Sequence, residues 1–154
     1  MANRKNSNNI KGFSLFELLI TMGIMMLLAL IVFPVTIQKA QQSKLESYAS
    51  QLVTDIYYQQ QRAALKGIEG GIYLSTNSYT LFDGPSLLEA VDTDIKRYPS
   101  NIRISSVEIL NREDIFFNKG EFKPYSYGTL MISDGQNNIR VYINREGLIG
   151  YENI

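Results

Sequence analysis

The first long hydrophobic stretch of the chain runs from Phe13 to Phe33, and Glu17 is the only charged residue among its 21 positions. A helix over this stretch is about 30 Å long, which matches the hydrocarbon core of a lipid bilayer. A carboxylate inside a membrane helix costs roughly 2.5–3.5 kcal/mol to insert, so we expect Glu17 to have a function. The pattern therefore predicts a transmembrane helix over residues 13–34 with an acid near its start.

The helical pattern continues over residues 35–66, which contain no glycine and no further proline. Apolar residues recur there at gaps of three, four and seven positions, which indicates one face of an amphipathic helix. These residues are Leu45, Tyr48, Ala49, Leu52, Ile56 and Ala63. Lys66 places a cation in the last turn, and Gly67 is a typical helix terminator. Pro34 lacks a backbone N–H, so we expect the helix to kink there.

Residues 67–154 predict a β-rich globular domain. The expected strands are 72–74, 79–82, 102–104, 115–117, 130–133 and 139–143, whereas residues 85–98 are expected to be helical or irregular. The first two strands flank a short turn and the last two flank the loop 134–138, so each pair predicts a hairpin. Asn144 to Gly147 then predicts a turn into residues 148–151.

These elements together predict an α+β fold, in which a long N-terminal helix, transmembrane in one half and amphipathic in the other, packs on an antiparallel β-sheet. Apolar residues alternate with more polar ones over residues 139–143, which is typical of a half-buried antiparallel strand. We therefore expect Leu45, Leu52 and Ile56 of the helix to be buried against Ile139, Val141 and Ile143 of that strand.

Residues 1–12 form a short basic leader with Arg4, Lys5 and Lys11 and no acidic residue. Because cytoplasmic flanks of membrane helices are rich in Lys and Arg, we expect the leader in the cytoplasm and the C-terminal domain outside it. The whole chain balances 15 basic residues against 15 acidic ones, so loss of the leader would leave 12 basic residues and a net charge of −3. Such a charge provides no general attraction to nucleic acid.

The junction Gly12-Phe13 at the end of this leader, followed by Glu17 as the fifth residue after the junction, resembles the signature of type IV prepilins and type II secretion pseudopilins. The resemblance implies that a membrane peptidase cuts after Gly12 and methylates the new N-terminus at Phe13. It also implies that Glu17 partners the N-terminal amine during filament assembly. Pro34 lies where many pilins bend this helix.

The same resemblance implies the partners and the location of the protein. The partners would be a prepilin peptidase and methyltransferase, other pilins or pseudopilins in a filament, and an inner-membrane assembly platform. The precursor would cross the cytoplasmic (inner) membrane once, and its C-terminal domain would enter a pilus or pseudopilus after assembly.

Scattered positions in the C-terminal half resemble the GspH/FimT-type minor pseudopilins. They include a helix that ends with Gln61 to Lys66, a strand with Phe117, a turn at Gly120 and a closing turn at Gly147. Ordinary β-turn chemistry explains the same glycines, so both interpretations remain open. The chain has no cysteine, which departs from many major type IV pilins, whose C-terminal loop is closed by a disulfide.

The composition argues against an enzyme and against a resident cofactor or metal. The chain has no histidine and no cysteine, which excludes a Ser-His-Asp triad, a thiol nucleophile and an imidazole metal ligand. The most prominent carboxylates of the domain are expected on a solvated surface; they are Asp92, Asp94, Glu108, Glu113 and Asp114. Residues 134–138 loosely resemble a calcium loop but lack its terminal acid, so a hairpin turn is the simpler interpretation.

The sequence thus favours a structural pilin or pseudopilin subunit and leaves two alternatives open. The first is a DNA-binding minor pilin of a competence pilus, for which Arg140 and Arg145 are the candidate cations, although phosphate binding requires several cations together. The second is a signal-anchored domain of unknown role, which explains the hydrophobic stretch but not Glu17 or the Gly12-Phe13 junction. A cleaved secretory signal fits less well, because its apolar region is about 7–15 residues long.

Overall fold

The computed structural model describes residues 12–154, apart from the side chains of residues 31–38. The chain divides into two units, Met1–Ala40 and Gln41–Ile154, and each is described by itself. One helix, α1 (Leu15–Lys66), belongs to both ranges. Residues 1–11 of the expected leader 1–12 lie outside the described residues, and Pro34 is one of the residues whose side chains are not described. The kink at Pro34 therefore stays a prediction.

Helix α1 ends at Lys66, as the sequence predicts. Gly67 follows with φ of 64°, a left-handed conformation that glycine adopts at no steric cost. Two of the last carbonyls of the helix are satisfied by residues beyond it, because the N–H of Ile68 donates to the Arg62 carbonyl over 3.3 Å and the N–H of Gly120 donates to the Ala63 carbonyl over 2.8 Å.

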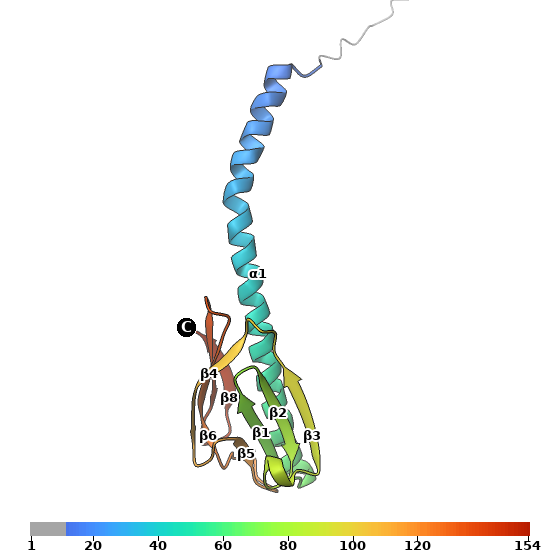
Figure 1. Ribbon diagram of the computed structural model, residues 1–154, viewed down its shortest axis with the longest axis vertical. Helices are drawn as coiled ribbons and strands as arrows, with labels where there is room; N and C mark the ends of the chain where they lie inside the picture. Colours follow the sequence, from blue (N-terminus) through green and yellow to red (C-terminus); the bar gives the residue numbers. More distant parts are fainter. Residues whose placement is uncertain (1–11) are drawn as a thin grey trace, which may run out of the picture. The chain divides into compact units, whose positions relative to one another are not determined.

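The described part of the globular unit contains two four-stranded sheets, and every strand pair is antiparallel (Figure 1). Sheet A has the strand order β3-β2-β1-β5, and sheet B has the order β4-β6-β7-β8. The strands of sheet A are β1 (Gly70–Ser75), β2 (Ser78–Asp83), β3 (Asp92–Arg97) and β5 (Ile115–Phe117). Those of sheet B are β4 (Arg103–Leu110), β6 (Tyr127–Ser133), β7 (Asn138–Ile143) and β8 (Ile149–Asn153).

Both predicted hairpins are confirmed, since β1 pairs with β2 and β6 pairs with β7. The expectation for residues 85–98 is wrong in its second half, because only Leu87–Glu89 is helical, as the short 3₁₀ helix η1, and Asp92–Arg97 is a strand. This strand has mostly exposed side chains, so its sequence shows no apolar alternation. Strand β4 is also longer than expected, because its register shifts between Ser105 and Glu108 and interrupts the pattern.

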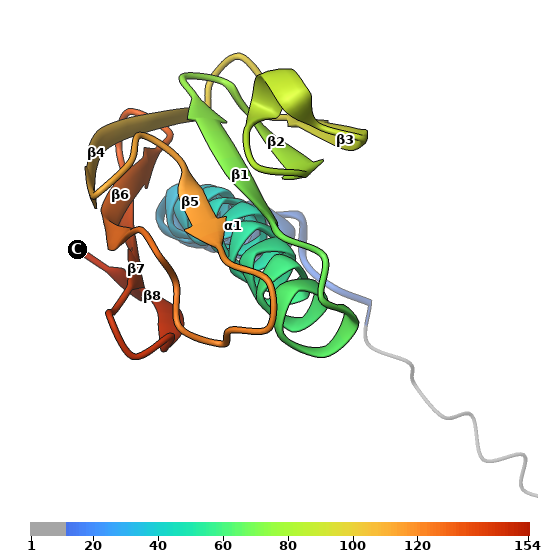
Figure 2. The same cartoon turned by 90° about the horizontal axis from the view of Figure 1, so that it is seen from below.

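The C-terminal part of α1 lies between the two sheets, which Figure 2 shows along the helix. Leu45, Leu52 and Ile56 are buried in one hydrophobic core with the inward side chains of β7, which are Ile139, Val141 and Ile143. This packing confirms the predicted α+β fold, a long N-terminal helix packed on antiparallel sheets. The fold differs from the expectation in one respect, because two sheets rather than one cover the helix.

Two adjacent glutamines on α1 connect the helix to both sheets. Gln59 and Gln60 are only 3% and 4% exposed. The Gln59 amide donates to the Phe82 carbonyl in β2 over 3.1 Å. The Gln60 amide donates to the Phe122 carbonyl, in the loop before β6, and to the Gly147 carbonyl, in the turn before β8, over 2.9 Å each.

Gly147 fits this contact for two reasons. Its φ is 89°, which disfavours any residue with a side chain. A Cβ added there would lie 2.8 Å from Nε2 of Gln60. The turn therefore requires glycine both for its backbone conformation and for the close approach of the Gln60 amide.

We predict that Gln60→Ala lowers the free energy of unfolding by about 1–3 kcal/mol, because two carbonyls lose the same donor. Gln60→Glu should destabilise more, since a buried carboxylate without donors would face two carbonyl oxygens. Thermal unfolding of the full chain in detergent, followed by circular dichroism, measures both effects. Gln61→Ala is the matched control, because Gln61 is exposed on the same helix. Equal melting temperatures for Gln60→Ala and Gln61→Ala would contradict the role of Gln60.

Candidate functional site

The candidate functional site is the N-terminal segment 12–30, which contains the residues predicted for cleavage, methylation and assembly; Pro34, predicted as the helix kink, lies beyond it. Helix α1 begins at Leu15, and the side chain of Ser14 caps it. The N–H of Phe16 donates to Ser14 Oγ over 3.4 Å, and the N–H of Leu18 donates to the Ser14 carbonyl over 3.1 Å. A serine at this position satisfies backbone donors that the start of a helix leaves unpaired.

Glu17 lies in the first turn of α1, where the unpaired N–H groups carry partial positive charge and favour a carboxylate. Its side chain is exposed. The ion pairs formed among residues 12–154 do not include Glu17. The carboxylate is therefore oriented by the helix start but is open to a cationic partner outside the described residues.

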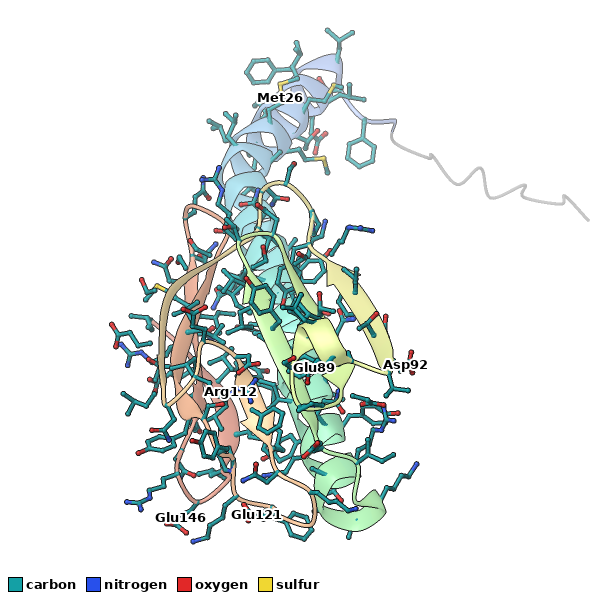
Figure 3. The ribbon with its side chains drawn as sticks, turned by 60° about the horizontal axis from the view of Figure 1, so that its bottom comes forward. Met26, Glu89, Asp92, Arg112, Glu121 and Glu146 are labelled. Atoms are coloured by element: carbon teal, nitrogen blue, oxygen red, sulfur yellow. The ribbon has the colours of Figure 1, made fainter. Side chains whose placement is uncertain are left out.

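The apolar side chains around Glu17 are exposed as well. Every side chain from residue 12 to residue 28 is exposed, with Phe13 at 79%. Met26 in Figure 3 illustrates how these side chains project from the helix. The hydroxyl of Thr21 already has a hydrogen-bond partner, because it donates to the Leu18 carbonyl of its own helix over 2.9 Å. Such an apolar surface is stable only when lipid or protein covers it.

Over the residues that the structure describes, no helix combines the length and the apolar character that crossing a membrane requires.

Gly12 is the first residue of this segment, and the described residues place no steric demand on it. A Cβ built at Gly12 would meet no heavy atom within 4 Å. The described residues therefore give no steric reason for a glycine at this position.

The expectation that five prominent carboxylates are solvated is wrong for Asp114, which is 7% exposed. Arg112 binds its carboxylate with two N–H donors over 2.6 and 2.9 Å, and the guanidinium lies 4.2 Å from the centre of the Phe116 ring. This bidentate pair compensates the charge and allows its burial. The other carboxylates are exposed; they are Asp92, Asp94, Glu108 and Glu113. Among the described residues, no three His, Cys, Asp or Glu side chains are grouped to hold a metal ion.

The loop 134–138 is a hairpin turn whose carboxylate serves the loop itself. Asp134 Oδ1 accepts the N–H of Gln136 over 2.9 Å and the N–H of Asn137 over 2.7 Å. Asp134 Oδ2 accepts the side-chain amide of Asn137 over 3.0 Å. Partial burial acts to raise the pKa of Asp134, but the hydrogen bonds from Asn137 and Gln136 outweigh it and hold the pKa below its usual value.

The arginines considered for DNA binding lie in and after β7. Arg140 forms an ion pair with Glu152 of β8 over 2.9 Å, so its charge is partly neutralised within sheet B. Arg145 is exposed beside Glu146 in the following turn. One of the two candidate cations is therefore already paired with an acid.

Sequence reasoning missed a polar cluster between α1 and sheet A. Tyr79 in β2 donates its hydroxyl to Asp55 of α1 over 2.5 Å, and the Tyr98 ring lies 5.6 Å from the Tyr79 ring. Burial raises the pKa of both hydroxyls, and the hydrogen bond to Asp55 raises that of Tyr79 further. In the sequence, the contact between Asp55 and Tyr79 was indicated only by the position of Asp55 directly before the core residue Ile56.

Comparison with known proteins places the candidate site in a described family motif. Residues 7–33 match the family model described as the prokaryotic N-terminal methylation motif. No curated protein and no solved structure matches the chain. The matched residues include Gly12, Phe13 and Glu17, so the match supports a type IV pilin-like or pseudopilin subunit.

Proteins with this motif are structural subunits rather than enzymes. The motif suggests processing by a prepilin peptidase and assembly with other pilins, and it implies a membrane-anchored precursor.

We predict that Asp134 makes the stability of the globular unit sensitive to acid. Its pKa is lower in the folded chain than in the unfolded chain, so its contribution is complete above about pH 4 and is lost as the pH falls through the folded value. Asp134→Asn should therefore lose less stability than the native chain on acidification, as measured by melting temperature. Glu113→Gln, which changes an exposed carboxylate, is the control and should follow the native curve. Identical curves for all three proteins would contradict the assignment.

Proposed function

We propose that this protein is a minor pilin or pseudopilin, a structural subunit of a type II secretion pseudopilus or of a type IV or competence pilus. The observation that carries the proposal is the single carboxylate of Glu17, placed in the first turn of an otherwise apolar and exposed helix segment. It follows the Gly12-Phe13 junction within residues that match the methylation motif. The subunit would join its filament through this helix.

The proposed life cycle begins with a single-pass precursor in the cytoplasmic membrane, with residues 1–12 as a cytoplasmic leader and residues 67–154 as the external domain. A prepilin peptidase removes the leader after Gly12, and the N-terminus at Phe13 is methylated. The open surroundings of Gly12 support this step, because a peptidase needs an accessible chain.

Glu17 acts in the next step, filament assembly. Cleavage creates an amine at Phe13, and an incoming subunit brings its amine to the carboxylate of Glu17 on a neighbour. Opposite charges attract far more strongly in a low-dielectric environment than in water, and one buried pair per subunit fixes the axial register of neighbouring helices. The location of Glu17 among exposed apolar side chains supports a pairing that apolar packing would bury.

The GspH/FimT-type subtype is part of the proposal. Its support is the buried Phe117 in β5 and the positive φ of Gly120 and Gly147, which mark the turns that the resemblance requires. DNA binding gains no support, since Arg140 is paired with Glu152.

The first prediction from this function is that the mature chain begins with a methylated Phe13. Mass spectrometry of the N-terminal peptide from assembled filaments should detect it. Gly12→Val should abolish cleavage and leave the precursor in the membrane, although the chain has room for the side chain. Gly23→Ala is a control, because that glycine also has open space and lies beyond the junction. Intact Met1 material in functional filaments would overturn the proposal.

The second prediction separates insertion from assembly. Glu17→Ala should be processed and inserted normally, or inserted better, because the membrane no longer accommodates a carboxylate. Its filaments should be strongly reduced, because the partner of the N-terminal amine is missing. Sheared filaments and membrane fractions, quantified side by side, measure the two effects.

Thr21→Ala is the matched control, one helical turn away, and should assemble normally because its hydroxyl is already bonded to the Leu18 carbonyl. Native filament levels for Glu17→Ala would show that Glu17 is not an assembly residue. Deletion of the gene, scored for secretion, transformation and surface filaments, identifies which of the proposed machines the subunit serves.

A further inference from the structure

A polar pocket of about 370 Å³ lies at the end of the globular unit where its part of α1 begins, and we call it the entry pocket. Three segments line it, namely α1, the loop between β3 and β4, and the turn between β6 and β7 (Figure 1). The polar residues that line the entry pocket are Gln41, Lys44, Asn101, Asp134 and Gln136. All of them belong to the unit Gln41–Ile154.

The entry pocket is rich in hydrogen-bond donors. The side chains of Gln41, Asn101 and Gln136 end in amides, each of which has two N–H donors. Lys44 adds an exposed ammonium, which takes part in none of the ion pairs formed among the described residues. The hydrogen bonds found among those residues also use none of these four side chains as donors. One ammonium surrounded by several amides suits an anion with several acceptor oxygens.

The acids at this end of the globular unit already have donors of their own. Asp134 accepts two backbone N–H groups and one side-chain amide from within its own turn. Glu46 accepts the side-chain amide of Gln42 over 3.3 Å and that of Asn153 over 2.9 Å. Neither carboxylate therefore depends on the ammonium of Lys44, which can bind an anion in the pocket.

Two further cations lie beside the entry pocket. Arg97 is the last residue of β3 and Arg103 is the first residue of β4, so the loop that contributes Asn101 connects them. Both arginines are exposed, and the ion pairs formed among the described residues include neither of them. Cations grouped in this way attract an anionic surface as well as a single anion.

The entry pocket is also close in sequence to the proposed membrane span. Gln41 and Lys44 follow residue 34 within ten positions of α1. Ten helical positions cover about 15 Å, which is the largest distance that α1 allows between the Lys44 backbone and the end of the span. Phospholipid headgroups extend roughly 5–8 Å beyond the hydrocarbon core, and a lysine side chain can span much of the rest. The phosphates of the membrane surface are therefore within reach of the pocket.

We propose that the entry pocket binds the phosphate of an anionic phospholipid in the membrane that anchors the chain. Lys44 supplies the opposite charge, the amides of Asn101 and Gln136 donate to the phosphate oxygens, and Arg97 and Arg103 attract the surrounding anionic surface. This contact holds the globular unit at the membrane until the subunit leaves for the filament. The inference rests on the membrane-anchored precursor of the proposed function.

An NMR titration of the full chain in a neutral detergent tests the site. Phosphatidylglycerol added to the micelles should shift the side-chain amide resonances of Asn101 and Gln136. Asn118 is the internal control, because its amide binds Glu121 over 3.2 Å in the loop after β5 and should not shift. Phosphatidylcholine carries the same phosphate but no net charge, so we expect it to bind much more weakly.

A single substitution tests the charge. Lys44→Gln should raise the fraction of phosphatidylglycerol needed for half-saturation roughly fivefold, because one cation near an anionic surface contributes a factor of about this size. Lys119→Gln is the matched control, since Lys119 is an exposed lysine in the loop after β5, and it should bind like the native chain. An unchanged Asn118 resonance shows that each variant is folded.

Three results would overturn the proposal. The first is the absence of shifts at Asn101 and Gln136, and the second is equal binding of phosphatidylcholine and phosphatidylglycerol. The third is displacement of the lipid by low millimolar inorganic phosphate, which would assign the pocket to a soluble anion. Glu17→Ala should titrate like the native chain, and membrane flotation tests the anchoring separately, so failure of the proposed function and failure of this inference are distinguishable.

Discussion

The side-chain amides of Gln59 and Gln60 are the contacts on which the arrangement of the globular unit depends. They are adjacent on one helix, yet the first donates to a strand of sheet A and the second to two loops of sheet B. Hydrophobic burial does not fix the direction of approach, because it is proportional to area and has no preferred geometry. Hydrogen bonds from the two side-chain amides do fix this direction. An amide left unpaired in the core would cost more free energy than its hydrogen bond gains. The glutamines therefore select one placement of the two sheets around the helix.

The sequence correctly predicts those helices and strands that have one buried face and one solvent-exposed face. The stripe from Leu45 to Ala63 and the alternation over 139–143 have this property, and both were located correctly. Strand β3 was missed because neither of its faces is well buried, so its sequence resembles that of a loop. Gln59 and Gln60 were missed because periodicity counts them as polar, although they lie three and four positions after Ile56 and continue the buried face. The prediction that Asp114 is exposed to solvent was wrong because its burial depends on the ion pair with Arg112, and composition does not show which residues form ion pairs.

The two units differ in how far each is complete by itself. The globular unit has a buried hydrophobic core and satisfies its helix end with its own groups. The N-terminal segment leaves Phe13 and its neighbours exposed, and its one charged group has no partner among residues 12–154. The Gly12-Phe13 junction and Glu17 were recognisable from sequence because the signature is local. No ion-pair partner of Glu17 lies among residues 12–154, so its role stays a proposal.

The path of the chain through the two sheets has a consequence for folding kinetics. Strand β5 lies between β4 and β6 in sequence, yet it pairs with β1 in sheet A while both of those strands belong to sheet B. The β1–β2 hairpin is local in sequence and can form within about 1–10 μs. Strand β5, in contrast, pairs Ile115 with Ile72 of β1, and these two residues are far apart in the sequence. Since β4 precedes β5 in the sequence and its partner β6 follows it, β4 has no partner strand until all the strands of sheet A are available. A chain released before residue 115 would therefore have one side of β1 unpaired and β4 without a partner, and each would offer backbone groups with which another chain could pair.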